Sequence, residues 1–199
     1  MAGLLVTLEG IDRSGKSTQA VLLARALDGD AILVREPGGT PAGERVRQIL
    51  KDPDVALGAE AEALLFAAAR AELVGQVIGP ALKAGRIVVC DRFLDSSLAY
   101  QGAARGLGVE AVRFINAPAV GGLRPDVTVL LEIAHEAAAG RGAEDDRFER
   151  EGESLQRAVA EAYEALAAAD PERWRRVDAA RAPQDVHADV LAAVKEACS

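Results

Sequence analysis

Nine residues near the start of the chain combine glycine, lysine and serine at the spacing of a phosphate-binding loop. The segment GIDRSGKST, residues 10–18, contains the frame G-x-x-x-x-G-K-S. Its glycines allow backbone amides to turn toward phosphate oxygens, while Lys16 is expected to reach the β- and γ-phosphates and Ser17 to bind Mg²⁺. The sequence therefore predicts a P-loop nucleotide site made by Gly10, Ile11, Asp12, Arg13, Ser14, Gly15, Lys16, Ser17 and Thr18.

A carboxylate that could share the metal follows a later apolar run. The segment RIVVCD, residues 86–91, reads as a buried strand that ends in Asp91. An aspartate in this position commonly organises Mg²⁺ beside a phosphate loop. The next residue is Arg92, which a purely magnesium-holding site would not need.

The basic residues indicate a second anion site. Arginine outnumbers lysine 19 to 4, and arginine binds phosphate in a bidentate manner. A GTPase would need an N-K-x-D guanine reader, but the single asparagine, Asn116, precedes Ala117. A motor or ATPase core usually has a longer chain, so a small-molecule kinase with two facing anion sites is favoured. The candidate arginines for the second site are Arg35, Arg45, Arg47, Arg70, Arg92, Arg141 and Arg147.

The elements that must position these residues alternate along the chain. Short apolar runs at 4–9, 31–36, 86–91, 126–133 and 174–179 predict strands. Helical spacing predicts helices over 16–27, from Thr40-Pro41, over 59–83 with a bend near Gly79-Pro80, over 151–169 and over 183–197. This alternation is typical of an α/β fold with a doubly wound parallel sheet of about five strands and helices on both faces. Ligands of such sheets bind at the carboxyl ends of the strands.

Length and composition limit the possibilities further. The 199 residues are predicted to form a single domain, 1–199. The net charge of -8 argues against broad nucleic-acid binding. The two cysteines form no close pair, which indicates a reducing compartment. The N-terminal segment resembles neither a signal peptide nor a membrane span, so a cytoplasmic protein without membrane or nucleic-acid partners is expected.

At this point the sequence resembles the thymidylate (dTMP) kinase family. The resemblance covers nearly the whole chain and is highly specific as a set. It rests on LEGIDRSGKSTQ (8–19), REPGGTPAGERVR (35–47), LLFAAARAE (64–72), DRFLDSSLAYQG (91–102), RPDVTVLLE (124–132) and DRFE (146–149).

The resemblance implies an enzyme that uses ATP and Mg²⁺ to convert dTMP to dTDP, which feeds dTTP synthesis for DNA replication. It also implies a homodimer and a short lid over about 140–149. The dTMP site would comprise Asp12 at the sugar and phosphate, Arg47 and Arg92 at the phosphate, Phe66 stacked on thymine, Arg70 hydrogen-bonded to the base, Ser97 and Gln101 along the base, and Tyr100 where a 2′-hydroxyl would lie. Arg147 is expected at the ATP site, and Ser17 and Asp91 at the metal.

The residues support part of this interpretation independently. Phe66 and Arg70 lie four residues apart on a predicted helix and so share a face. Phosphoryl transfer needs charge stabilisation more than acid–base chemistry, and Arg13 in the phosphate loop could reach the transferring group. The predicted catalytic residues are Lys16, Arg13, Arg92, Asp91 and Arg141.

Several points stay open at this stage. Family members place the catalytic arginine either in the phosphate loop or in the lid, and this chain has both. The lid region 132–149 is shorter than usual, His135 stands where proline is common, and the tip carries Glu144, Asp145 and Asp146. Another monophosphate or deoxynucleoside kinase is the alternative enzyme, and a nucleotide-sensing regulatory protein is the alternative from another class.

Overall fold

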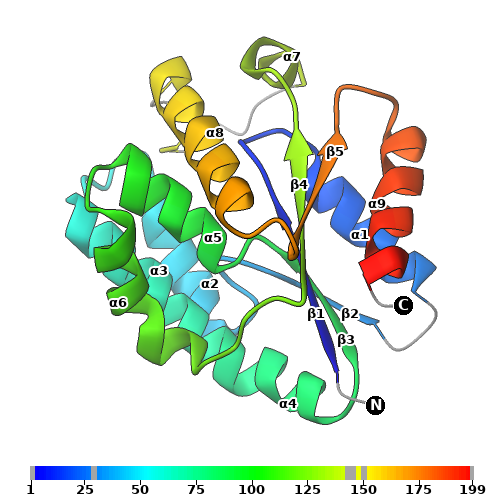
Figure 1. Ribbon diagram of the computed structural model, residues 1–199. Helices are drawn as coiled ribbons and strands as arrows, with labels where there is room; N and C mark the ends of the chain where they lie inside the picture. The colour runs from blue at the N-terminus through cyan, green and yellow to red at the C-terminus, as the bar shows by residue number, and fades with distance from the viewer. Residues whose placement is uncertain (1–2, 28–30, 142–146, 149–151, 198–199) are drawn as a thin grey trace.

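A computed structural model of the chain describes residues 3–27, 31–141, 147–148 and 152–197, and in this part it contains one parallel sheet (Figure 1). The strands are β1 (Leu4–Glu9), β2 (Ala31–Arg35), β3 (Ile87–Asp91), β4 (Val127–Glu132) and β5 (Trp174–Asp178). Their order is β2-β3-β1-β4-β5, and every neighbouring pair is parallel. The predicted five-stranded parallel sheet is confirmed.

The helices fill the connections between the strands. They are α1 (Lys16–Ala26), α2 (Pro41–Lys51), α3 (Ala59–Leu73), α4 (Gly79–Lys83), α5 (Leu94–Ser97), α6 (Val109–Val120), α7 (His135–Ala139), α8 (Gly152–Ala169) and α9 (Pro183–Ala197). Two π-helical segments, η1 (Val74–Ile78) and η2 (Leu98–Ala104), continue α3 and α5. Within the described ranges, no helix is long and apolar enough to cross a membrane.

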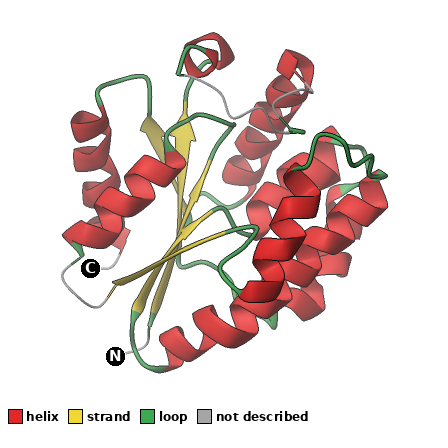
Figure 2. Cartoon of the chain, turned by 180° about the vertical axis from the view of Figure 1, so that it is seen from behind, coloured by secondary structure: helices red, strands yellow, loops and turns green. Residues whose placement is uncertain are grey.

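Helices cover both faces of the sheet, as the alternation predicted (Figure 2). On one face, Leu23 of α1 and Val190 of α9 pack against Val6, Val129 and other strand residues. The opposite face has two apolar clusters. One joins β4 and β5 to η2 and α8, and the other joins β1 and β3 to α3, η1, α4 and α6. The sheet is therefore buried on both sides, which explains its nearly continuous apolar strands.

Two parts of the helical prediction differ from the structure. The pattern over 59–83 is interrupted at η1, before the expected bend at Gly79-Pro80. The Gly79 N–H bonds to Val74 O, five residues back, and Pro80 has no N–H to continue a regular α-helix. Helices over 94–104 and 109–120 were not predicted. Serine, tyrosine and glycine in the first segment, and valine, asparagine and Pro118 in the second, have weak helix propensity. Packing against α3 and α8 holds the two segments.

The strands point the same way, so the loops that follow them gather at one edge of the sheet. The carboxyl ends of β4 and β5 lie toward the top of Figure 1, near α7 and α8. The phosphate loop follows β1, and Asp91 ends β3, the strand paired with β1. This edge brings together residues that are far apart in the sequence.

Candidate functional site

The phosphate loop has the conformation that its glycines predict. Gly10 and Gly15 have φ values of 144° and 98°, and a Cβ atom on Gly10 would lie 2.6 Å from Leu131 O. The Lys16 ammonium donates to Ile11 O at 2.6 Å and to Ser14 Oγ at 3.3 Å. Burial lowers the pKa of Lys16 to about 8, with a further contribution from the Arg92 charge, whereas Asp12 and other carboxylates oppose the shift.

The loop meets the end of β3 as the sequence predicted. The Ser17 hydroxyl donates to Asp91 Oδ2 at 2.5 Å. A hydroxyl and a carboxylate side by side are the hard oxygen ligands that Mg²⁺ accepts, together with water and substrate phosphates. The donor types and their contact therefore fit a Mg²⁺ ion at Ser17 and Asp91.

A cavity of about 350 Å³ opens beside the loop. Seven of the eight residues predicted to bind dTMP line it: Asp12, Arg47, Phe66, Arg92, Ser97, Tyr100 and Gln101. The cavity is also lined by residues that the sequence did not assign to it, namely Glu36, Pro37, Lys51, Ser96 and Phe148. Six of the lining residues are cationic, although the chain carries a net charge of -8: Arg13, Lys16, Arg35, Arg47, Lys51 and Arg92. The cavity therefore suits an anionic ligand with an aromatic part.

Arg92 is fixed at the bottom of this cavity. Its backbone has a φ of 68°, which is unusual for a residue with a side chain. Its guanidinium donates to Asp12 Oδ1 at 2.5 Å and to the Tyr100 hydroxyl at 3.3 Å, and also to Gly10 O and Ser96 Oγ. Burial would raise the pKa of Asp12, but Arg92 and Lys16 outweigh it and hold that pKa below its usual value.

Buried Glu9 is linked to Arg92 through the hydroxyls of Ser96 and Tyr163, which contact both residues. Glu9, at the end of β1, is fully buried and accepts from Phe93 N, Ser96 Oγ and the Tyr163 hydroxyl at 2.6–2.9 Å. Burial raises the pKa of Glu9 to about 7, and the charge of Asp95 adds to the effect. Nothing in the sequence singled out Glu9 or Tyr163, since a glutamate that ends a strand and a tyrosine on an apolar helix face are common.

Arg70 is the one predicted dTMP residue that does not line the cavity, and its expected hydrogen bond to the base stays a prediction. Its side chain is 1% exposed, and it donates to Glu36 Oε2 at 2.8 Å, Ser97 Oγ at 3.1 Å and Phe93 O at 3.1 Å, and also to Asn116 Oδ1. Phe66 and Arg70 share a face of α3, but Phe66 lines the cavity and the Arg70 side chain is buried against Glu36. Pairing with Arg70 compensates the cost of burying the Glu36 carboxylate. The arrangement supports a role for Arg70 in holding Ser97 and Glu36.

Arg147 makes protein contacts that the sequence analysis did not anticipate. It was expected at the ATP site, but its guanidinium pairs with Glu62 of α3 at 2.6 Å and donates to Leu50 O at 3.0 Å. Glu62 is 1% exposed and also accepts from Gln101 and Arg105. This ion pair, between partly buried Arg147 and buried Glu62, holds the 147–148 segment against α3.

Phe148 consequently reaches the first cavity. Its ring meets Phe66 at a centroid distance of 6.0 Å and Tyr100 at 6.3 Å, both edge to face. The predicted lid over 140–149 is described only at 140–141 and 147–148, so Glu144, Asp145 and Asp146 lie outside the described residues. The sequence had given no signal that Phe148 lines this cavity.

A second cavity, of about 490 Å³, lies on the other side of the phosphate loop. Arg141 lines it and donates to Ser14 O at 3.3 Å and Ala179 O at 2.6 Å. Arg13, with a φ of 60°, donates to Ala139 O at 3.2 Å. The loop between β5 and α9 and the first turn of α9 contribute residues that the sequence did not predict: Ala179, Arg181, Pro183 and Val186. Arg13, Lys16 and Ser17 line both cavities and so form their common wall.

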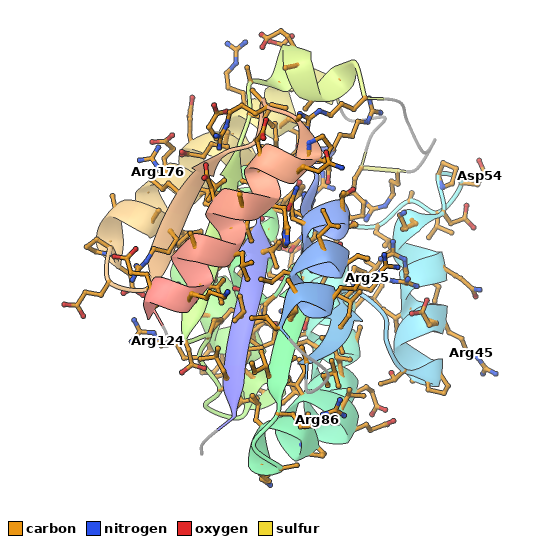
Figure 3. All side chains as sticks on the ribbon, turned by 90° about the vertical axis from the view of Figure 1, so that its right-hand side faces the viewer. Arg25, Arg45, Asp54, Arg86, Arg124 and Arg176 are labelled. Carbon is orange, nitrogen blue, oxygen red and sulfur yellow. The ribbon has the colours of Figure 1, made fainter. Side chains whose placement is uncertain are left out.

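Arg45, one of the candidate arginines, is not part of either cavity. It lies on the exposed face of α2, and in Figure 3 its side chain points away from the body of the molecule. Arg25, Arg86, Arg124 and Arg176, labelled in the same view, also lie at the surface (Figure 3). The abundance of arginine alone therefore does not mark the site.

Comparisons with known proteins match nearly the whole chain to one family. A family model described as thymidylate kinase matches residues 8–190. The chain is similar to the thymidylate kinase of Pelotomaculum thermopropionicum, with 48% identity over 98% of this chain and 94% of that protein. It is also similar to the thymidylate kinases of Symbiobacterium thermophilum, at 47% identity over 97% and 93%, and Halothermothrix orenii, at 44% over 98% of each.

Proposed function

The chain belongs to the thymidylate kinase family, and we propose how its two cavities carry out the family's reaction, ATP + dTMP → ADP + dTDP. The observation that supports this most is the common wall of Arg13, Lys16 and Ser17 between the cavities. A donor on one side and an acceptor on the other would bring two phosphate groups together at these residues. Such an arrangement transfers a phosphoryl group directly between them and limits access of water.

In this proposal the cavity beside Phe66 and Tyr100 binds dTMP. Phe66 offers a ring for stacking on thymine, and Arg92, Arg47 and Asp12 lie where the phosphate and sugar would be. Ser97 and Gln101 line the same wall; the Gln101 amide is oriented by Glu62, to which it donates at 2.7 Å. Tyr100 fills space beside Arg92 and is proposed to exclude a ribose 2′-hydroxyl.

The second cavity is proposed to bind ATP along the phosphate loop. An oxygen of the dTMP phosphate attacks the γ-phosphorus, the bond from that phosphorus to the β,γ-bridging oxygen breaks, and ADP leaves. The attacking oxygen is already ionised at neutral pH, so the protein mainly supplies positive charge and alignment. Lys16, Arg92, Arg13 and Arg141 are the cations placed for this purpose.

Magnesium is proposed as the cofactor, with Ser17 and Asp91 as the protein groups that hold it. When bound, Mg²⁺ neutralises charge on the β- and γ-phosphates. The contact of 2.5 Å between Ser17 Oγ and Asp91 Oδ2 supports the proposal, since both oxygens could face one ion. Asp91→Asn should lower kcat and raise the Mg²⁺ concentration needed for half-maximal rate.

The expected homodimer and cytoplasmic location are also proposals. Phe114 of α6 is 82% exposed and Leu64 of α3 is 57% exposed, and these two helices pack against each other. An apolar face of this kind fits a second copy of the chain. Buried, unpaired Cys90 suits a reducing compartment. Light scattering after size exclusion should give the mass of a dimer, and Phe114→Glu should shift it toward a monomer.

A coupled assay of ADP release tests the proposed acceptor site. The substrates are dTMP, dUMP, dCMP, dGMP and AMP, each at saturating ATP. We expect the highest kcat/KM for dTMP, because a purine needs more space and loss of one methyl group weakens binding about tenfold or more. A higher kcat/KM for any other acceptor would assign the cavity to a different monophosphate.

A further inference from the structure

A glutamine of helix α8 makes two hydrogen bonds to Asp12. The Gln156 amide donates from Nε2 to Asp12 Oδ2 at 2.6 Å and accepts from the Asp12 backbone N–H at 3.0 Å. Gln156 is 5% exposed and lies on the packed face of α8. Its side chain therefore brackets both the backbone and the carboxylate of one phosphate-loop residue, from an element 144 residues further along the chain.

The same face of α8 also contacts Arg92. Tyr163 lies seven residues after Gln156, two helical turns along the same face. Its hydroxyl lies 3.4 Å from the Arg92 guanidinium and donates to Glu9 Oε2 at 2.8 Å. Val159, between the two residues, is fully buried. Helix α8 thus contacts both members of the Asp12–Arg92 ion pair through a rigid, packed surface.

We propose that Gln156 is a positioning residue for the reaction, which orients the Asp12 carboxylate toward the acceptor and Arg92. A carboxylate can rotate, and the bond from Gln156 to Oδ2 leaves Oδ1 for Arg92. The bond to the Asp12 backbone fixes the loop immediately before Arg13. The inference rests on the proposed placement of dTMP beside Asp12.

The charged groups around Asp12 determine how a substitution of Gln156 would affect the Asp12 carboxylate. Asp12 faces Arg92 from the loop after β3, Lys16 from the phosphate loop, and the Tyr100 hydroxyl from η2. Glu9 and Asp91 lie near these cations, and Tyr163 lies beside Arg92. In this setting the Gln156 amide is a neutral donor, which supports an ionised Asp12 without altering the net charge.

A double-mutant cycle tests the role of Gln156. Gln156→Ala should lower kcat/KM for dTMP about 10- to 100-fold, as expected for loss of a hydrogen bond to a charged group, and leave the KM for ATP near wild type. In an Asp12→Ala background the same substitution should change kcat/KM less than it does in the wild-type background, because the carboxylate is gone and only the bond to the backbone N–H of residue 12 remains. Thermal unfolding of each variant checks that it is folded.

A second variant, Gln156→Glu, should change the pH dependence of activity, which a purely structural role of Gln156 would not affect. In Gln156→Glu, the introduced carboxyl can still accept from the Asp12 backbone N–H. It can donate to the Asp12 carboxylate only while it is protonated. Two carboxylates in contact share one proton, so the pKa of the pair is raised. The activity of Gln156→Glu relative to wild type should therefore be highest at low pH and fall as pH rises. For Gln156→Ala, and for the control Gln48→Glu at an exposed site of α2, the ratio to wild type should not depend on pH.

The outcomes separate the inference from the proposed function. If Asp12→Ala leaves kcat/KM for dTMP unchanged, dTMP does not lie beside Asp12 and both fail. If Asp12→Ala is damaging but the effect of Gln156→Ala simply adds to it, only the positioning role is overturned. A relative activity of Gln156→Glu that does not vary with pH would also overturn it.

Discussion

Arg13 adopts a left-handed backbone conformation, with a φ of 60°, between the two cavities of the enzyme. Few residues with a side chain adopt this conformation, and glycine adopts it at no cost. The position therefore retains a charged side chain where the backbone alone would favour glycine. Its guanidinium also bonds to Ala139 O of α7, beside Arg141.

If Arg13 stabilises the transition state, Arg13→Gly should lower kcat and kcat/KM together and leave both KM values near wild type. Loss of such an arginine can cost about 10³-fold in phosphoryl transfer. We expect a smaller loss, because Arg141 also lines the donor cavity. Glycine relieves the backbone strain, so thermal stability should not fall.

A double-mutant cycle with Arg141→Ala, measured as single-turnover rates, tests whether the two arginines share this role. Arg141→Ala should harm the Arg13→Gly protein more than it harms wild type. Simple additivity would mean that the arginines act independently. A higher KM for ATP with unchanged kcat would mean that Arg13 only binds.

The position of Tyr100 leads us to expect selectivity for deoxyribose over ribose in the acceptor nucleotide. Its ring lies 5.1 Å from the Arg92 guanidinium carbon and its hydroxyl 3.3 Å from an Arg92 nitrogen. A 2′-hydroxyl would compete for this space, so ribothymidine monophosphate should have a much lower kcat/KM than dTMP. Tyr100→Ala should bring the kcat/KM for ribothymidine monophosphate closer to that for dTMP. Equal kcat/KM for both substrates with the wild-type protein would exclude Tyr100 from this role.

At the scale of elements, the 147–148 segment and α8 are the unexpected parts of the site. Both lie late in the chain and reach residues of the first hundred. Arg147 pairs with Glu62 of α3, and Gln156 brackets Asp12 of the phosphate loop. Phe148, in the segment expected to cover ATP, thus lines the cavity that is proposed to bind dTMP.

Phe148→Ala tests this placement. An edge-to-face aromatic pair contributes about 0.5–1.5 kcal/mol beyond buried area, and Phe148 contacts both Phe66 and Tyr100. The KM for dTMP should therefore rise about two- to tenfold, with the KM for ATP unchanged. Phe66→Ala provides the comparison, since it should also affect dTMP alone. A rise in the KM for ATP instead would assign Phe148 to the donor cavity.

At the scale of the whole molecule, the site constrains stability through Glu9. Its pKa is raised to about 7 in the folded protein by burial, whereas an unfolded glutamate titrates near 4.3. Between these values the folded state binds more protons than the unfolded state, so stability falls as pH rises.

Glu9→Gln should remove this part of the pH dependence. The wild-type free energy of unfolding should fall by up to about 3 kcal/mol more than that of Glu9→Gln between pH 4.5 and 7.5. Chemical denaturation at several pH values measures the difference. Glu60→Gln, at an exposed position of α3, is the control and should keep the wild-type slope. An unchanged slope in Glu9→Gln would mean that Glu9 is not buried with its proton.

The sequence by itself determined the sheet, the phosphate loop and the reaction class. The short apolar runs, the G-x-x-x-x-G-K-S frame and the aspartate that ends β3 are local features of the sequence, and the structure keeps all three. The segments shared with the family located seven of the eight dTMP residues on one cavity. Such features survive in the sequence because backbone geometry fixes them within a few residues.

Only the tertiary structure decided which way individual side chains face. Arg70 and Phe66 share a helix face, yet Arg70 turns to buried Glu36 and Asn116, while Phe66 faces the cavity. Each of the side chains Glu9, Gln156, Phe148 and Arg147 contacts a partner at least 82 residues away. Burial sets the pairing of these charges and amides, because a desolvated polar group needs a partner. That partner is supplied by packing of distant elements, which no local spacing records.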